Sequence, residues 1–321
     1  MEVIQYSESH RDEWEAFVQQ SINGNFLHSR AFYDQNPMNA ADDASLMFYR
    51  KGKLAAVLPA VKYEKDGRTL LNSHLRSTYG GYIISAKMGM TDAVSMVQAT
   101  LDYAAEHTIG EIIIRNPFRI FYNAISDETD YAMWYHGFSI LYRELETYID
   151  LTPTLEEIKK GYDKGTKYNT IKAWKTVTVQ ETEDYASFWA MLTENLTSKY
   201  GKQPVHSLSQ ILDLRNAVGA ENIKLFGAYT DNVFIGGCVV FVFGNGLHAQ
   251  YIAQDNNYQE HRCINAVTDY IIDWGKNNNF TCFNLGTGND RQGRYINEGL
   301  THFKESFGGR GVLRESMHKI L

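Results

Sequence analysis

The chain has 321 residues, of which 44% are hydrophobic and 13% aromatic, and its formal net charge is −7 at pH 7. This length exceeds the ~250–300 residues at which one hydrophobic core stops growing, so we expect two domains, and the apolar content argues against a disordered chain. The acidic balance provides no field that attracts phosphodiester backbones, which argues against nucleic acid as a partner.

The cysteines and the chain start bear on location. The three cysteines, Cys238, Cys263 and Cys282, lack paired or metal-ligand spacing, and the ten histidines show no metal-binding helix pair, so we predict a reducing compartment and no metal. Met1 to Gln5 lack the features of a secretion signal, and no run approaches the ~18 apolar residues of a membrane span. We therefore expect a cytoplasmic protein, whose oligomeric state the sequence leaves open.

The first half predicts strands, a helix and a strand, after a short N-terminal helix that contains Trp14 and Val18. Residues 46–49 and 54–61 flank a turn and predict a hairpin, and residues 70–84 add further strands. The next helix is expected from Thr91, its predicted cap, to Gly110. Residues 112–114 then form a buried strand.

The second half repeats this order. Residues 223–229, 233–243 and 247–253 predict a three-stranded meander, and residues 280–285 predict a buried strand. Between them lies a helix whose apolar positions each come 170 residues after their counterparts in the first half: Ile264, Val267, Ile271 and Trp274 follow Val94, Val97, Leu101 and Ala104. The agreement predicts two copies of one unit.

The boundary between the copies lies near residue 150. After a strand over residues 147–151, Thr154 and Glu157 have capping-box spacing and predict the start of a helix. We therefore divide the chain into domains 1–150 and 151–321. A second capping box, at Ser207 and Gln210, predicts a helix that ends near Gly219.

The first candidate site is the junction between strand 247–253 and the helix that begins near Cys263. The N-terminus of that helix favours an anion such as pyrophosphate, and Arg262 can add a charge-assisted contact. A solvated surface loop is the alternative. Cys263 can act as a nucleophile at a helix N-terminus, but a small buried cysteine is the simpler interpretation.

The second candidate site is the glycine-rich loop after strand 280–285, which contains Asn289. Such loops at the C-terminal ends of buried strands commonly bind ligands. In the following helix, the core face is predicted to comprise Ile296, Leu300, Phe303 and Phe307, while Asn297 and Lys304, seven apart, share another face and are expected to point into a cleft. The alternative is a glycine-rich turn followed by a surface lysine.

Three segments carry a family resemblance: Trp14 with Asn23-Gly24-x-Phe26-Leu27-His28-Ser29, Tyr200-Gly201-x-x-Pro204-Val205-His206-Ser207, and Asn297-x-Gly299-Leu300-x-x-Phe303-Lys304-Glu305-x-Phe307-Gly308. Together they resemble the GNAT-related FemAB-like acyltransferases over nearly the whole chain. The resemblance implies an α/β (α+β) fold of two tandem GNAT-like domains, each a mixed, mostly antiparallel sheet with flanking helices. It also implies that an acyl or aminoacyl donor meets an amine acceptor in a cleft of the second domain.

The chain departs from ordinary GNAT domains at the donor loop. Their signature, Gln or Arg, two residues, Gly, one residue, then Gly or Ala, falls on Gln259 to Ile264, where no glycine is present. An acyl-coenzyme A such as acetyl-coenzyme A is the donor that GNAT domains imply. Fem-type transferases, which the family also resembles, use charged transfer RNA, but the acidic balance argues against that donor.

Direct acyl transfer requires a proton acceptor for the amine and a group that stabilises the oxyanion. We assign catalysis to His206, because imidazole titrates near neutral pH, and to Tyr251 on the central strand. The alternatives are a histidine that caps or packs beside the next helix and an aromatic on a half-buried sheet.

The remaining candidates are grouped by expected partner. Those expected to bind the donor are Gln250, Arg262, Cys263, Asn289 and Asn297, and those expected to bind the substrate are Lys172, Lys175, His248 and Lys304. A solvated face is the alternative for Lys172 and Lys175. We expect the acceptor to be an amine of a small molecule or a cell-envelope precursor. The alternative function is a non-catalytic small-molecule binding module derived from a GNAT domain, which the missing glycines favour.

Overall fold

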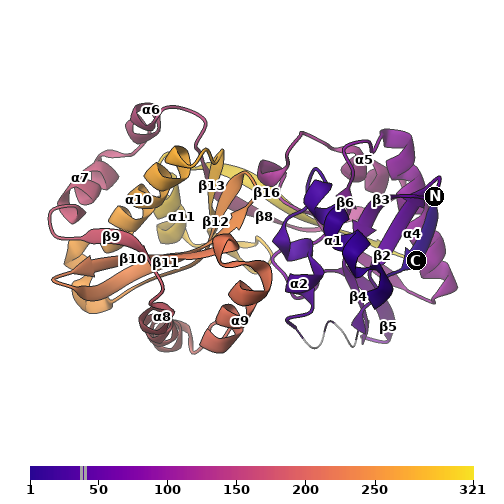
Figure 1. Cartoon of the computed structure of the whole chain (residues 1–321), viewed down its shortest axis with the longest axis horizontal. Coiled ribbons are helices and arrows are strands. Elements are labelled where there is room, and N and C mark those ends of the chain that lie inside the picture. Colours follow the sequence, from indigo (N-terminus) through magenta and orange to yellow (C-terminus); the bar gives the residue numbers. More distant parts are fainter. Residues whose placement is uncertain (37–38, 40–41) are drawn as a thin grey trace. The chain divides into compact units, whose positions relative to one another are not determined.

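The structure is a computed structural model and describes residues 1–36, 39 and 42–321. Contacts divide the chain into two compact units, Met1–Glu144 with Leu313–Leu321, and Leu145–Val312 (Figure 1). The divisions fall inside two strands, β8 (Ser139–Asp150) and β16 (Arg310–Ile320). The C-terminal end folds with the first unit because β16 pairs with β7 (Glu111–Arg115), a long-range pairing that the division at residue 150 did not include.

In the first unit the longest described helix, α4 (Met90–Glu106), follows six described strands in the chain and precedes another. Its other described helices include α1 (Arg11–Gln20), α2 (Arg30–Tyr33) and α5 (Glu128–Tyr135). Its other strands are β1 (Glu2–Gln5), β2 (Leu46–Arg50), β3 (Lys53–Leu58), β4 (Ala60–Lys65), β5 (Arg68–Ser73) and β6 (Ile83–Ile84). They pair in the orders β1-β2-β3-β6 and β4-β5-β7-β16. Only β5 and β7, which flank α4 in the chain, are parallel among the described pairs of this unit.

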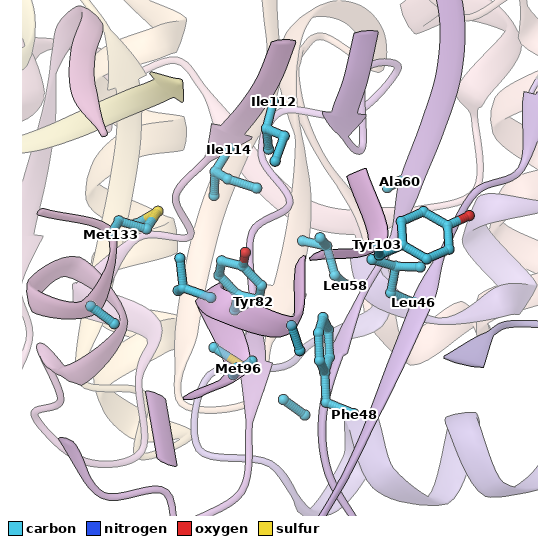
Figure 2. Close-up of a cluster of buried hydrophobic side chains, with 14 of the residues drawn as sticks. Leu46, Phe48, Leu58, Ala60, Tyr82, Met96, Tyr103, Ile112, Ile114 and Met133 are labelled. Atoms are coloured by element: carbon cyan, nitrogen blue, oxygen red, sulfur yellow. The ribbon is translucent and has the colours of Figure 1, made fainter. Parts of the chain in front are cut away.

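The core of the first unit lies between these strands and α4. Figure 2 shows Phe48, Leu58, Tyr82, Met96 and Ile114 within this cluster, all of them fully buried or nearly so. Strand residues two apart share one face of the sheet, and helix residues three or four apart share one face of the helix. The two faces meet in this core. Burial of such side chains supplies the main driving force for folding.

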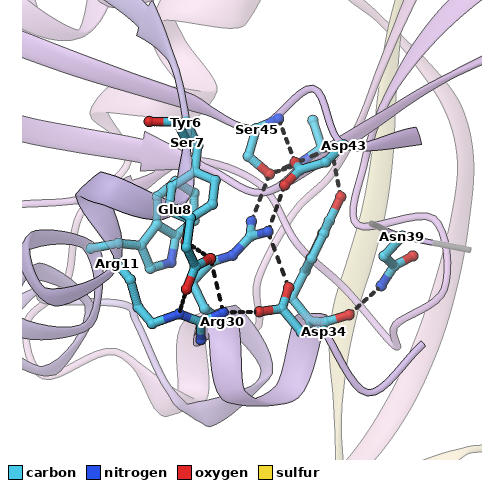
Figure 3. Close-up of polar contacts among 12 residues, drawn as sticks. Tyr6, Ser7, Glu8, Arg11, Arg30, Asp34, Asn39, Asp43 and Ser45 are labelled. Atoms are coloured by element: carbon cyan, nitrogen blue, oxygen red, sulfur yellow. Dashed lines mark hydrogen bonds and ion pairs between the residues drawn. The ribbon is translucent and has the colours of Figure 1, made fainter. Parts of the chain in front are cut away.

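A buried cation anchors the start of the first unit (Figure 3). The Arg30 guanidinium donates to Asp43 at 2.5 Å, Asp34 at 3.1 Å and Ser45 at 3.2 Å. It also lies 3.9 Å from the ring centre of Tyr6. A charge this deep requires such partners, so we interpret the cluster as structural.

The second unit has the same order of elements. Its helices include α6 (Leu155–Lys160), α7 (Lys164–Ala173), α8 (Tyr185–Tyr200), α9 (Leu208–Val218), α10 (Cys263–Asn277) and α11 (Glu298–Glu305). Its other strands are β9 (Thr178–Thr182), β10 (Ile223–Thr230), β11 (Val233–Phe243), β12 (Gly246–Gln254), β13 (Cys282–Thr287), β14 (Asn289–Asp290) and β15 (Tyr295–Ile296). The main sheet runs β8-β13-β12-β11-β10-β9, and β12 and β13, which flank α10, are parallel. The predicted fold of two similar mixed units is therefore confirmed.

Local signals predicted several boundaries correctly and missed others. Both capping boxes form, at Thr154 with Glu157 and at Ser207 with Gln210. The expected strand 54–61 was wrong, because Pro59, which cannot donate to a ladder, separates β3 from β4. The cap expected at Thr91 was also wrong, since α4 begins after Gly89.

The phase expected for α11 was wrong in part. Leu300 is 41% exposed and Ile296 63% exposed, so neither belongs to the core, whereas Phe307 is fully buried. Lys304, expected on another face than the core residues, is itself only 4% exposed. A short helix preceded by a two-stranded hairpin starts later than the apolar pattern indicated.

Candidate active site

The site of interest is a fork between β12 and β13. The two strands pair only over Gly246–His248 and Cys282–Asn284. Beyond His248, β12 continues to Gln254 along β11, while β13 continues beside β8. The β12 edge from Ala249 onward therefore has no strand partner on the β13 side among the described pairings, and such an edge can bind an extended ligand.

A β-bulge in β12 determines which side chains meet at the fork. Ala249 faces Val240 and Tyr251 faces Val239, so Gln250 is the extra residue of the bulge. An extra residue reverses the alternation of side chains along a strand. His248 and Tyr251, three positions apart, consequently lie on the same face of the sheet, whereas the sequence pattern alone puts them on opposite faces.

His206 and Tyr251 are in direct contact. The Tyr251 hydroxyl lies 2.6 Å from His206 Nδ1, and the Trp189 indole donates to the His206 carbonyl oxygen at 2.9 Å. Burial lowers the pKa of His206 and raises the pKa of Tyr251 to about 12. At neutral pH the imidazole is therefore neutral and the phenol protonated, which is the state that a proton acceptor requires.

A hollow of about 670 Å³ adjoins this pair. Its walls are the side of α8, the segment before α9 and the first turn of α9, and its lining includes Trp189, Thr193, Pro204 and His206. The size is within the range of small-molecule sites. Because Ser207 caps α9, the capping box positions His206 at the rim.

Lys304 lies at the other side of the fork. Its ammonium donates to the Thr287 carbonyl oxygen at 2.5 Å, and burial lowers its pKa to about 8, against an opposing effect of the Glu146 carboxylate. Gly286 leaves space beside it. A Cβ at Gly286 would lie 3.7 Å from Lys304 Nζ and 4.0 Å from His248 Cε1, so lysine, glycine and histidine converge here.

Two residues of this cluster were missed by sequence reasoning. Glu146 on β8 is 2% exposed and Asn284 on β13 is fully buried. The Asn284 amide donates to Glu146 Oε2 at 2.7 Å, and Asn284 Oδ1 accepts from the Gly286 N–H at 2.8 Å. A polar residue amid the apolar run Phe283 to Leu285 was the available signal for Asn284. Nothing local indicated Glu146, because its partners come from β13, more than a hundred residues later.

The start of α10 keeps the backbone shape of a donor loop without its glycines. Arg262 occupies the first glycine position of the GNAT signature and adopts the left-handed conformation that glycine favours, with φ 54°. It is exposed and makes no side-chain cap at the start of α10. Cys263 is fully buried and its pKa is raised to about 12, which favours packing over nucleophilic chemistry.

The other candidates have structural contacts or are exposed. Asn297 caps α11, where its side chain accepts from the Leu300 N–H. Asn289 donates to the Leu145 carbonyl oxygen at 2.8 Å. Lys172 and Lys175 are exposed, on α7 and just after it. The donor-binding roles of Asn289 and Asn297 and the substrate-binding roles of Lys172 and Lys175 stay predictions.

A model of the acetyltransferase (GNAT) domain matches residues 157–304. This segment of the chain is similar to GNAT acetyltransferase domains. This match assigns the chain to the acyltransferase class, as the sequence predicted, and it encloses β12, the fork, His206 and Lys304. Among curated protein sequences, none matches the chain.

Solved structures share the fold of the whole chain. FemX has a TM-score of 0.73 at 13% identity, with 100% of this chain and 98% of that chain covered. L-PGS from Bacillus licheniformis has a TM-score of 0.58 at 14% identity, with 96% and 90% covered. A tandem GNAT protein from the clavulanic acid biosynthesis pathway has a TM-score of 0.51 at 10% identity, with 99% and 98% covered. These similarities confirm the FemAB-like, tandem GNAT fold.

Proposed function

We propose that this protein is an N-acyltransferase, which moves an acyl or aminoacyl group from an activated donor to an amine by direct attack at the fork of the second unit. The observation that carries this proposal is the convergence of Lys304, His248 and Gly286 where β12 leaves β13. Tyr251, the hydrogen-bonded partner of His206, lies further along β12.

The fork fits an acyl-coenzyme A in two respects. The free edge of β12 from Ala249 can pair with an extended amide-bearing arm, and the uncapped start of α10 with Arg262 can hold a phosphate. Such a donor supplies an activated acyl carbonyl. Cys263 does not obstruct the site because its side chain is turned into the core, beneath β11.

The amine must lose a proton during transfer. The neutral His206 can take it through the Tyr251 hydroxyl, which donates to Nδ1 when the histidine carries its own proton on Nε2. A proton then passes from the amine to the Tyr251 oxygen while the hydroxyl proton moves to His206. As the C–N bond is completed the bond between the acyl carbon and the donor's sulfur breaks, and the thiolate leaves with the proton returned from His206 through Tyr251. The high pKa of Tyr251 favours this relay over a free phenolate.

Lys304 can stabilise the oxyanion. Its ammonium is fixed by Thr287 and lies in a poorly hydrated site, where a charge acts more strongly than in water. His248, beside it on β12, can bind the acceptor. We propose an amine of a cell-envelope precursor or a small molecule as acceptor, supported by the folds of FemX and L-PGS.

Calorimetry with acetyl-coenzyme A, followed by a transfer assay, tests this proposal. We expect wild type and His206→Ala to bind acetyl-coenzyme A alike, because His206 acts on the amine, and Arg262→Gln to bind it more weakly. Transfer to an amine should be lost in His206→Ala. Failure of every variant, wild type included, to bind any acyl-coenzyme A would favour the non-catalytic binding module or an aminoacyl donor.

A further inference from the structure

The surface of α7 differs in charge from the rest of the protein. Residues 159–175 contain six lysines and one acidic residue, Asp163, a net charge of +5 in a chain of net charge −7. Lys159 is neutralised by Asp269 and Asp273, at 3.1 and 2.8 Å. Lys160 pairs with the exposed Glu156 at 2.8 Å. Lys164, Lys167, Lys172 and Lys175 have no ion pair among the described contacts and form a cationic surface.

Apolar side chains lie among these lysines. Tyr168 is 69% exposed, Ile171 64% and Trp174 40%. We call the set Lys164, Lys167, Tyr168, Ile171, Lys172 and Lys175 the α7 face, and all its members are exposed. Exposed apolar groups flanked by lysines are typical of a helix that lies in the interface of an anionic bilayer.

A second exposed aromatic surface provides a contrast. On α5, Trp134 is 67% exposed and Tyr135 59%, but the nearby acids Asp127, Glu128 and Asp130 outnumber Arg119, which pairs with Asp127 and Asp130. An acidic surface is repelled by anionic lipids. Aromatic exposure is therefore shared by both surfaces, and only α7 adds the complementary charge.

The α7 face is held rigidly in place. Asp269 on α10 accepts from the Tyr162 hydroxyl and from the Trp174 indole, both at 2.9 Å, and thus fixes both ends of α7. Figure 1 shows α7 at the outer side of α10. A pre-formed helix loses little conformational freedom on binding, which favours even a small membrane contact.

We propose that the α7 face binds the surface of an anionic lipid bilayer. In this proposal Lys172 and Lys175, assigned from the sequence to substrate binding, contact lipid headgroups. Tyr168 and Ile171 would enter the headgroup region, with the lysines at the level of the phosphates. The proposal does not depend on acyl transfer, so each can fail without the other. It would bring the second unit to a surface where lipid-linked amines reside.

Sedimentation with vesicles tests the proposal. Full-length protein is mixed with vesicles of phosphatidylcholine alone or of phosphatidylcholine with 30% phosphatidylglycerol, and the bound fraction is measured at low and high salt. We expect binding only to the anionic vesicles and its loss at high salt. Each lysine should contribute roughly fivefold, so Lys164→Gln with Lys172→Gln should weaken binding about 25-fold. Tyr168→Ser with Ile171→Ser should weaken it about tenfold or more.

Trp134→Ser on α5 is the matched control, because it removes an equally exposed aromatic from an acidic surface. It should bind anionic vesicles like wild type. Circular dichroism confirms that each variant is folded. Absence of wild-type binding to anionic vesicles, or equal binding by the α7 variants, would overturn the proposal. So would binding to a duplex RNA, lost in the lysine variant, without binding to vesicles.

Discussion

Each unit contains a parallel strand pair that flanks its main helix, and the two pairs end differently. In the first unit β5 and β7 pair over Leu70–Asn72 and Glu111–Ile113. Immediately beyond, Ser73 Oγ accepts from the N–H groups of Arg115 at 2.8 Å and Gly81 at 3.1 Å, and Gly80 donates to the Arg115 carbonyl oxygen at 2.9 Å. The chain itself closes this fork. In the second unit no hydrogen bond among the described contacts joins β12 to β13 beyond His248 and Asn284, and the buried Lys304 lies there instead, donating to the Thr287 carbonyl oxygen.

The closing loop requires its glycines. A Cβ on Gly80 would lie 2.5 Å from His74 Cβ, and one on Gly81, at φ +83°, would lie 2.7 Å from Pro117 Cδ. Beside the loop, His28 and His74 are fully buried, and burial lowers their pKa values to about 4 and 3. The first unit thus uses its polar groups to fill the fork between β5 and β7. The second unit instead places the buried Lys304 beside the fork between β12 and β13. One scaffold can serve as support and as site.

The largest effect is expected from removing the ammonium charge of Lys304 at the fork of the second unit. Lys304→Met should lower the rate of transfer by about 100- to 1,000-fold, the range for loss of one oxyanion-stabilising group. Steady-state release of the donor's leaving group measures this. Lys276→Met is the matched control, because Lys276 also donates to a backbone carbonyl, that of Thr152 at 2.9 Å, but lies outside the fork. Full activity of Lys304→Met would exclude the assigned role.

Loss of the relay at Tyr251 should cost about 100-fold. Tyr251→Phe removes only the hydroxyl that contacts His206. If the two residues act as one relay, the double variant with His206→Ala should be no slower than the slower single variant. Multiplied losses in the double variant would instead show two independent contributions. Tyr63→Phe in the first unit is a control for removal of a phenolic hydroxyl.

Activity should fall as pH rises through about 8. Lys304 acts as a cation, and its pKa is lowered from 10.5 to about 8. Above that pH kcat/KM should decline by about tenfold per unit. Stability should move the opposite way: between pH 8 and 10 the unfolded chain binds a proton that the folded chain lacks, so the free energy of unfolding rises relative to Lys304→Met. A flat kcat/KM between pH 7 and 10 would contradict the assignment.

Opening the closed fork should affect stability alone. Ser73→Ala leaves the Arg115 and Gly81 N–H groups without their acceptor and should cost about 2 kcal/mol of unfolding free energy. Urea denaturation measures the loss. Transfer activity of the folded protein should stay within twofold of wild type. Ser95→Ala provides the matched control, because Ser95 is half-buried on α4 and its hydroxyl donates only within the helix, to the Thr91 carbonyl oxygen. A large loss of activity in folded Ser73→Ala would contradict the purely structural role of the fork between β5 and β7.

The sequence revealed what is encoded locally. The caps at Thr154 and Ser207 and the phase of α10 depend on residues within a few positions of each other, so they could be predicted. The bulge at Gln250, the plug at Ser73 and the contact between Glu146 and Asn284 depend on which strands become neighbours. Lys304 shows the limit most clearly, since a lysine on a polar helix is ordinarily a surface residue.

Hydrogen exchange with and without acetyl-coenzyme A tests most directly whether the open fork is the donor site. Backbone amides of β12 between Ala249 and Ala253 should exchange more slowly when the donor is bound, because the donor pairs with the free edge. Amides of the first unit between His74 and Gly81 should be unaffected, since that fork is closed. Slower exchange at His74 to Gly81, with β12 unchanged, would contradict the account.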